Sequence, residues 1–341
     1  MDKPNQVDVL VTLPFNEQQI NELREISPRL RLLFQPVRRA EDVPNEIWGR
    51  SEVLYTDNIL PTPEQAPSLR WLQCHYAGIE SLFDSPLLQK KDLMITTLSG
   101  AAAPQMAEFA LTMMLALGHR LPEMNQAQTK ADWPKDRWER FNPVELRGST
   151  VGIVGYGSIG REVARLVRAV GATVLATKRD VMHPEDTGYS LPELGDPGGD
   201  LFHRLYPPQA LRSMLHQCDF VVVTLPLTPH TRNIIGAGEL AAMKPTAYLI
   251  HLARGTVIDP AALLSALQER RIAGAALDVF PEEPLPANSP LWRLNNVILT
   301  PHMAGVSSHY NERAIQLFAD NLKRYLSGAP LLNRFDPEKG Y

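Results

Sequence analysis

The stretch VGIVGYGSIG, residues 151–160, decides the fold of this chain. An apolar run precedes its glycines, a stretch of helical character follows them, and a second apolar run begins at Thr173. A GxGxxG pattern in a strand–turn–helix–strand context is the fingerprint of a dinucleotide-binding unit. We expect Gly155 to form the tight turn, Gly157 to let the backbone approach a pyrophosphate, and Gly160 to let helix and strand pack closely. The alternative is a glycine turn that serves packing alone.

Short apolar runs alternate with helical stretches on both sides of this motif. The alternation predicts parallel strands with helices on both faces of a sheet, in two successive α/β series. The expected strands are residues 7–13, 30–34, 53–56, 69–75, 93–97, 150–154, 173–177, 220–224, 247–252, 274–279 and 297–300. The expected helices are residues 16–26, 104–117, 159–170, 208–216, 260–270 and 308–326.

Composition narrows the class of protein. A hydrophobic fraction of 44% and a charged fraction of 21% over 341 residues exclude wholesale disorder. A net charge of −4 argues against a basic face for nucleic acid. The longest apolar stretch, residues 109–117, is shorter than the ~20 residues that span a bilayer. Two cysteines make no disulfide framework and the N-terminal stretch lacks a signal-peptide layout, so we expect a cytoplasmic protein.

The strand that follows the glycine motif ends in TKRD, residues 177–180. NAD-binding units usually carry an acid near this point, which accepts hydrogen bonds from the ribose 2′-hydroxyl. Here Lys178 and Arg179 stand there, and cations attract a 2′-phosphate. The sequence therefore predicts NADP(H) in preference to NAD(H). The alternative is a solvated basic strand end, with Asp180 reaching back to the ribose.

Three later strands each end in a residue suited to acid–base chemistry, namely Arg254, Glu283 and His302. The carboxyl ends of parallel strands share one edge of a sheet, where ligands collect. Arg254 would hold a substrate carboxylate and the neighbouring carbonyl oxygen, and His302 would donate a proton to that oxygen. Glu283 would favour the charged imidazole, and Asp278 would bind the nicotinamide amide. Taken singly, each of the three has a plain alternative as a surface cation, a solvated loop acid or a capping residue.

Two features stay outside this scheme. Residues 182–207 are rich in Gly, Pro and Asp and show no clear period, and a loop of that length is either functional or mobile. The remaining histidines and both cysteines lack the spacing of a zinc site, so no metal is predicted.

Together with these residues, the motifs DFVVVTLPLTPHTRNII (219–235), ARGTVIDPAALLSAL (253–267), GAALDVFPEEPL (274–285) and NVILTPHMAG (296–305) resemble the D-isomer-specific 2-hydroxyacid dehydrogenases. The resemblance implies a Rossmann dinucleotide-binding domain, residues 102–305, inserted into a flavodoxin-like substrate-binding domain, residues 1–101 and 306–341. It also implies a homodimer joined through the nucleotide domains. The usual Asn before the Ala-Arg-Gly turn is replaced by His251, which we interpret as a polar strand-end residue and not as a second acid.

The same resemblance implies the site residues. The catalytic residues would be Arg254, Glu283 and His302, and the backbone N–H groups of Ala77 and Gly78 would hold the substrate carboxylate together with Arg254. The cofactor contacts would be Met106, Gly155, Tyr156, Gly157, Ser158, Ile159, Gly160, Lys178, Arg179, Leu225, Pro226, Thr231, Leu252, Ala253, Asp278 and Ala304.

The function that these observations predict is NAD(P)H-dependent reduction of a small 2-ketoacid to the D-2-hydroxyacid. Glyoxylate and hydroxypyruvate are the first candidate substrates, and a bulkier 2-ketoacid is the alternative within the same class. An alternative from another class is a dinucleotide-sensing interaction protein like the transcriptional corepressors that resemble this family. The lack of a basic bias in the sequence weighs against that alternative.

Overall fold

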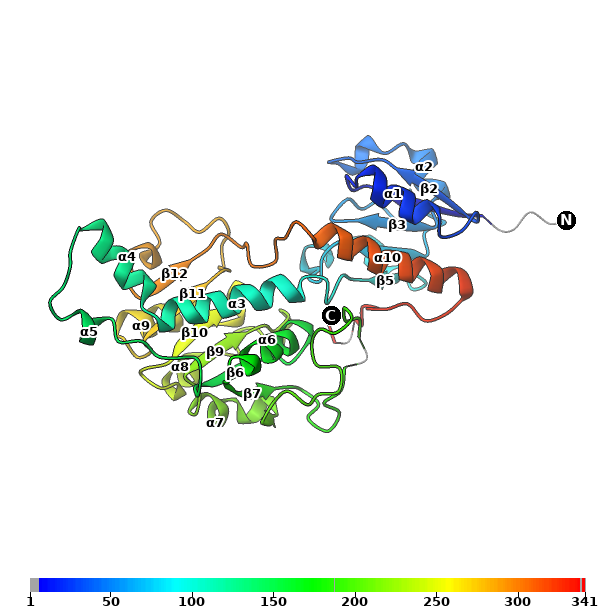
Figure 1. The fold of residues 1–341 in the computed structure, drawn as a ribbon. Coiled ribbons are helices and arrows are strands. Elements are labelled where there is room, and N and C mark those ends of the chain that lie inside the picture. The colour runs from blue at the N-terminus through cyan, green and yellow to red at the C-terminus, as the bar shows by residue number, and fades with distance from the viewer. Residues whose placement is uncertain (1–5, 187, 338, 341) are drawn as a thin grey trace. The chain divides into compact units, whose positions relative to one another are not determined.

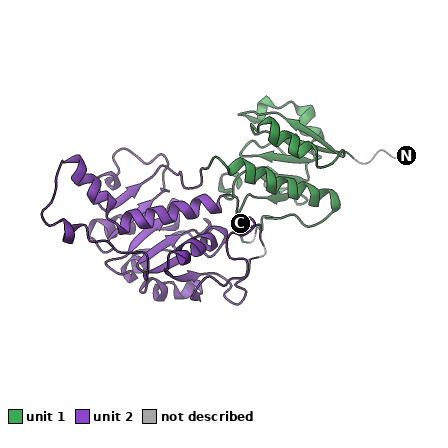
Figure 2. Ribbon diagram, in the orientation of Figure 1, with its two compact units in different colours: residues 1–101, 307–341 green, residues 102–306 purple. Residues whose placement is uncertain are grey.

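The computed structural model describes residues 6–186, 188–337 and 339–340. The chain folds into two compact units, one formed by residues 1–101 and 307–341 and the other by residues 102–306 (Figure 2). We call them the first unit and the second unit. Each is an α/β unit built on a parallel sheet (Figure 1). Because the first unit is formed by both ends of the chain, the second unit is an insertion in its sequence.

The first unit contains a five-stranded parallel sheet with the strand order β2-β1-β3-β4-β5. This is the strand order of flavodoxin-like folds. Its strands are β1 (Val7–Val11), β2 (Leu30–Phe34), β3 (Val53–Thr56), β4 (Trp71–Cys74) and β5 (Met94–Thr96). Its helices are α1 (Glu17–Arg24), α2 (Asn45–Arg50) and α10 (Tyr310–Ser327).

The last helix, α10, completes the core of the first unit. Phe318 is fully buried, and its ring lies 4.4 Å from the ring of Tyr55 on β3 and 5.4 Å from that of Trp71 on β4. Asn321 on the same helix is also fully buried, and it accepts the N–H of Leu332 at 2.7 Å and donates to the Leu332 carbonyl at 3.2 Å. The helix therefore packs on the sheet and also fixes the segment that follows it.

The second unit contains a seven-stranded parallel sheet with the order β12-β11-β10-β9-β6-β7-β8. Its strands are β6 (Thr150–Val154), β7 (Thr173–Thr177), β8 (Arg204–Tyr206), β9 (Phe220–Val223), β10 (Tyr248–His251), β11 (Gly274–Leu277) and β12 (Val297–Leu299). Its helices are α3 (Ala103–Gly118), α4 (Leu121–Thr129), α5 (Arg137–Arg140), α6 (Ser158–Ala169), α7 (Leu211–Leu215), α8 (Ala237–Ala242) and α9 (Pro260–Gln268).

Helices cover both faces of this sheet. The cluster containing Met114 of α3 and Val163 of α6 lies on one face, and the cluster containing Leu211 of α7, Leu240 of α8 and Leu267 of α9 lies on the other. The strand order reverses between β6 and β9, which makes the carboxyl ends of these two strands the switch point of a doubly wound sheet. The Rossmann architecture that the family resemblance implied is confirmed.

The structure also contains elements that the sequence pattern did not predict. The strand β8 lies inside the stretch predicted to be irregular, and the helix expected over residues 208–216 is a 3₁₀ turn, Pro208–Ala210, followed by the short α7. The helices α2, α4, α5 and α8 were also missed, because segments of four to nine residues show too few periods to stand out. Across the described residues, no helix has the length and apolarity needed to cross a membrane.

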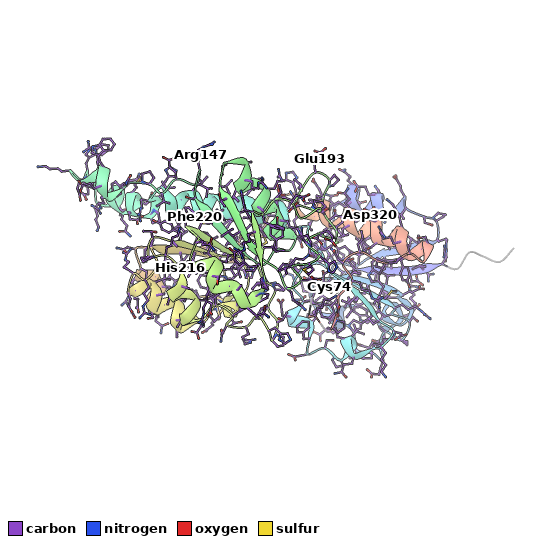
Figure 3. The ribbon with its side chains drawn as sticks, turned by 90° about the horizontal axis from the view of Figure 1, so that it is seen from below. Cys74, Arg147, Glu193, His216, Phe220 and Asp320 are labelled. Carbon is purple, nitrogen blue, oxygen red and sulfur yellow. The ribbon has the colours of Figure 1, made fainter. Side chains whose placement is uncertain are left out.

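We expect Asn321→Leu to destabilise the first unit. The N–H and carbonyl of Leu332 would lose their partners at a half-buried position, which costs about 1–3 kcal/mol. The matched control is Asp320→Asn, at the position labelled on α10 in Figure 3, where only an exposed pair with Lys323 at 3.4 Å is lost. Thermal unfolding should separate the two variants, and equal melting temperatures would contradict the role given to Asn321.

Candidate active site

The glycine turn between β6 and α6 has the shape that a pyrophosphate needs. Gly155 has a φ of 107°, a conformation that other residues rarely adopt, and a Cβ at Gly160 would overlap the carbonyl oxygen of Gly155. A Cβ at Gly157 would meet no atom within 4 Å. Helix α6 begins at the next residue, Ser158, so its first N–H groups and its positive dipole end face this open space. The turn therefore fits the phosphates of a dinucleotide.

Tyr156 and Thr177 tie this turn to the neighbouring strand. The Thr177 hydroxyl accepts the N–H of Gly155 at 3.1 Å, and the Thr177 carbonyl accepts the N–H of Tyr156 at 2.9 Å. The side chain of Tyr156 is buried, and its hydroxyl donates to Asp196 at 2.6 Å. Tyr156 thus stands in the predicted cofactor turn, but its N–H and its hydroxyl are both bonded within the protein.

The end of β7 carries the predicted basic pair. Arg179 is exposed, whereas the half-buried Lys178 donates to the backbone carbonyls of His183 and Glu185. Burial and the nearby charge of Arg161 lower the pKa of Lys178. Asp180 lies 2.7 Å from the ring of His183 and also accepts the N–H of Met182, so its carboxylate is bonded locally.

The other predicted cofactor residues of the second unit lie on the α3 and α6 helices or after strand ends. Met106 lies on α3 and Ile159 on α6, and both pack half-buried against one apolar cluster. The remaining ones follow the strands β9, β10 and β12, and they are Leu225, Pro226, Thr231, Leu252, Ala253 and Ala304. Because the sheet is parallel throughout, these strand ends share the edge that carries the glycine turn.

Arg254, Glu283 and His302 also lie beyond adjacent strands at this edge. The His302 Nδ1 atom lies 2.7 Å from a Glu283 carboxylate oxygen, and the other oxygen accepts the N–H of Phe280 at 2.9 Å. Arg254 follows β10, and its charge acts on the Glu283 carboxyl. The structure therefore brings the three predicted residues together within the second unit.

Glu283 is held in its ionised form. Partial burial would raise the pKa of its carboxyl, but the hydrogen bonds from His302 and Phe280, together with the charge of Arg254, outweigh burial and lower it. The contact with Glu283 fixes the orientation of the His302 ring. Since Nδ1 faces Glu283, Nε2 is the ring nitrogen left to carry a proton toward a substrate.

Asp278 has a role in the site that the sequence did not reveal. Its side chain is 1% exposed, and its carboxylate accepts hydrogen bonds from the Thr300 hydroxyl at 2.6 Å and from the N–H groups of Met303 and Ala304 at 2.8 and 2.9 Å. These bonds surround His302, which has a φ of 54°. Asp278 therefore holds the turn that presents His302, and its expected contact with nicotinamide stays a prediction.

Gly255 is a second residue whose role in the site the sequence analysis did not identify. A Cβ at this position would overlap the backbone of Phe280 and Pro281, so the turn carrying Arg254 lies against the start of the loop that carries Glu283. The sequence did contain a signal for this contact, because an isolated glycine at a strand end often marks a place where two backbone segments approach closely.

His251, the departure from the family pattern, is buried at the end of β10. Burial lowers its pKa to about 4, so the ring is neutral near pH 7. This agrees with its interpretation as a polar strand-end residue and not as a second acid. Within the part of the chain that the structure describes, no group of three or more His, Cys, Asp or Glu side chains is placed to hold a metal ion.

Ala77 and Gly78 belong to the first unit, where they follow β4. Ala77 is exposed and Gly78 is half-buried. Gly78 also lines a cavity of about 100 Å³. The other residues that line this cavity are Asp57, Asn58, Cys74, Tyr76, Ile79 and Leu82.

A doubly wound sheet with a glycine turn at its switch point and an Arg–Glu–His set at its carboxyl edge is the arrangement of a nicotinamide-dependent dehydrogenase. Residues 111–304 match the family described as "D-isomer specific 2-hydroxyacid dehydrogenase, NAD binding domain". The chain is 34% identical over 278 residues to a glyoxylate reductase of Thermofilum pendens, covering 81% of this chain and 77% of that protein. It belongs to the D-isomer-specific 2-hydroxyacid dehydrogenase family and is an oxidoreductase that acts on the CH–OH group of 2-hydroxyacids.

Solved structures support the same assignment. The chain matches the D-isomer-specific 2-hydroxyacid dehydrogenase of Xanthobacter autotrophicus, solved with NADPH and MES, with a TM-score of 0.78 and 29% identity over 99% of this chain and 100% of that one. It also matches an NADPH-dependent glyoxylate/hydroxypyruvate reductase of Sinorhizobium meliloti, solved with citrate, with a TM-score of 0.72 and 27% identity over 97% and 98%.

Two glycine substitutions should separate packing from cofactor binding. Gly160→Ala places a methyl group against the Gly155 carbonyl, and we expect a lower melting temperature from a loss of about 1–3 kcal/mol. Gly157→Ala places the methyl group in open space at a φ of −94°, so the fold should stay intact while NADPH affinity falls about tenfold or more. Thermal unfolding and cofactor titration measure both effects. Wild-type affinity in Gly157→Ala would refute the pyrophosphate site.

Proposed function

We propose that this protein reduces a small 2-ketoacid to the D-2-hydroxyacid with NADPH, with glyoxylate and hydroxypyruvate as the first candidate substrates. The observation that carries this proposal is the His302–Glu283 pair, at 2.7 Å, beside Arg254 on the edge that carries the glycine turn. The choice of substrates is supported by the names of two similar proteins, the glyoxylate reductase of Thermofilum pendens and the glyoxylate/hydroxypyruvate reductase of Sinorhizobium meliloti.

In this mechanism NAD(P)H, when bound, supplies the hydride that reaches the carbonyl carbon. His302 transfers the proton on Nε2 to the carbonyl oxygen, so that the C=O bond becomes a CH–OH group. Glu283 accepts a hydrogen bond from Nδ1 throughout, which holds the ring in place with Nε2 left for the proton transfer. The reverse reaction uses the same atoms, with His302 taking the proton back.

Arg254 supplies the positive charge for the substrate. A guanidinium has a planar fork of donors that matches a carboxylate and an adjacent carbonyl oxygen, and it polarises the carbonyl as negative charge develops. In the first unit, we propose that the N–H groups of Ala77 and Gly78 bind a substrate carboxylate. Their position directly after β4, with Ala77 exposed and Gly78 half-buried, supports this role.

We propose NADP(H) as the preferred cofactor. Thr177 stands where NAD-binding units carry an acid, and its hydroxyl is bonded to the glycine turn. Lys178 and Arg179 bring two cations to the same strand end, and Asp180 is paired with His183. The NADPH in the Xanthobacter structure supports this preference.

The segment between α3 and β6 supports the proposal of a homodimer. Trp133 and Trp138 are 82% and 77% exposed, and Leu121 on α4 is 46% exposed. Several large apolar side chains exposed on one segment are typical of a surface that contacts another protein chain.

We expect His302→Gln to lower kcat for ketoacid reduction by about 10²-fold or more, because the proton donor is removed. Affinity for NADPH should stay near that of the wild type. The assay follows the loss of reduced-nicotinamide absorbance with glyoxylate, hydroxypyruvate, pyruvate and a bulky 2-ketoacid.

The wild type tests the wider proposal in the same assay. Turnover with a small 2-ketoacid supports the reductase, and preference for the bulky substrate would correct the substrate class. Cofactor binding without any turnover would favour the dinucleotide-sensing alternative. Wild-type rates in His302→Gln would remove His302 as the proton donor.

The cofactor preference is tested by Lys178→Met combined with Arg179→Gln. The double variant should bind NADPH about tenfold or more weakly, because two charge-assisted contacts to the 2′-phosphate are lost, while NADH binding changes little. Titration of both cofactors measures the two affinities. An equal loss for NADPH and NADH would contradict the role of this strand end.

A further inference from the structure

Residues 181–186 and 188–203 lie in the connection from β7 to β8, and they are bonded to the helix that follows the glycine turn. The Arg161 side chain on α6 is 3% exposed, and it donates to the carbonyls of Asp196 and Pro184 at 2.5 Å each and lies 3.4 Å from the Asp186 carboxylate. Its neighbour Glu162 accepts the N–H of Gly195 at 2.6 Å. The described residues of the connection are therefore anchored to the second unit.

Asp196 is the centre of these contacts. Its carboxylate accepts the Tyr156 hydroxyl at 2.6 Å and the N–H groups of Asp200 and Leu201 at 2.9 Å each. Burial would raise the pKa of this carboxyl, but these hydrogen bonds and the charge of Arg161 lower it. The Arg161 guanidinium lies 4.7 Å from the centre of the Tyr156 ring, so the acid, the cation and the phenol form one packed group.

This group joins two parts of the proposed cofactor site. Tyr156 stands between Gly155 and Gly157 of the glycine turn, and Arg161 directly follows Gly160. The segment that they hold begins directly after the Lys178–Arg179 strand end, where the ribose of a dinucleotide lies in this fold.

The segment in turn positions Lys178. Its ammonium donates to the carbonyls of His183 and Glu185, which flank the Pro184 carbonyl that Arg161 holds. An ammonium has three N–H donors, so these two bonds leave one donor for a phosphate oxygen. A long lysine side chain loses less entropy on binding when its orientation is already fixed.

We propose that Asp196, together with Tyr156 and Arg161, is a positioning residue for cofactor selectivity, because it fixes residues 181–186 and 188–203 as a wall beside the 2′-phosphate of NADPH and through them orients Lys178. This inference rests on the proposed preference for NADP(H). Asp196 acts through the segment and does not touch the cofactor.

The negative charge of Asp196 allows a test in which electrostatics alone and the positioning role predict opposite changes in NADPH affinity. Asp196→Asn removes a negative charge close to the proposed phosphate site, which by electrostatics alone should strengthen NADPH binding. The positioning role predicts the opposite, a loss of about tenfold in NADPH affinity with less than about twofold change for NADH. The matched control is Glu193→Gln, the same change of acid to amide at an exposed position of the same segment, labelled in Figure 3. The control should leave the ratio of the two affinities unchanged.

Two further variants keep the test independent of folding defects. Tyr156→Phe removes only the hydroxyl bond to Asp196 and should shift the affinity ratio in the same direction by about threefold. In a Lys178→Met background, Asp196→Asn should add little to the loss of NADPH affinity, because two changes in one pathway are not additive. Titration of NADPH and NADH to each folded variant gives all these values.

The outcomes separate the two proposals. A wild type that prefers NADPH, with a smaller preference in Asp196→Asn and Tyr156→Phe, supports the positioning role. A wild type that prefers NADPH, with an unchanged or larger preference in both variants, overturns the inference and leaves the proposed function standing. A wild type without preference for NADPH overturns this inference and the proposed cofactor preference, while turnover with a 2-ketoacid still decides the proposed reductase activity.

Discussion

The parallel pairing of β10, β11 and β12 is the constraint on which the candidate site depends. In this register Ile250 pairs with Ala276 and Ala276 with Ile298, so the three strands end almost level. A parallel pairing brings residues about 25 positions apart in the sequence to one edge, because each strand is followed by a return over the face of the sheet. Arg254, Glu283 and His302 meet for this reason.

The sheet could be predicted because its strands are buried on both faces. Such strands are continuous apolar runs, and the expected strand at residues 173–177 coincides with β7, while the one at 220–224 exceeds β9 by a single residue. The strand β8 could not be predicted in the same way. It has three residues, and its first, Arg204, is exposed at the edge of the sheet, so the apolar pattern that marks the other strands is missing.

Local motifs also indicated which residues would lie at the site, but not which residues hold them there. The residue types of His302 and Glu283 and their positions after strand ends were sufficient to propose them as a proton donor and its partner. The hydrogen bonds of Asp278 to the turn around His302, and of Tyr156 to Asp196, join residues 22 to 40 positions apart with no repeating pattern between them. Such bonds depend on how loops return to the sheet, which only the folded chain specifies.

The residues between and after the glycines distinguish this glycine turn, because they bond it to the connection between β7 and β8. The glycines provide what turns of this type have in common, namely a positive φ, space for a ligand to approach the backbone, and close contact between helix and strand. Tyr156, Arg161 and Glu162 are not required for these features, yet all three are buried, and each bonds to the connection between β7 and β8. A buried charge is seldom favourable for stability alone, since desolvation opposes its attraction to a partner. Fixing one conformation of a long connection beside a proposed phosphate site is a function that accounts for placing those charges there.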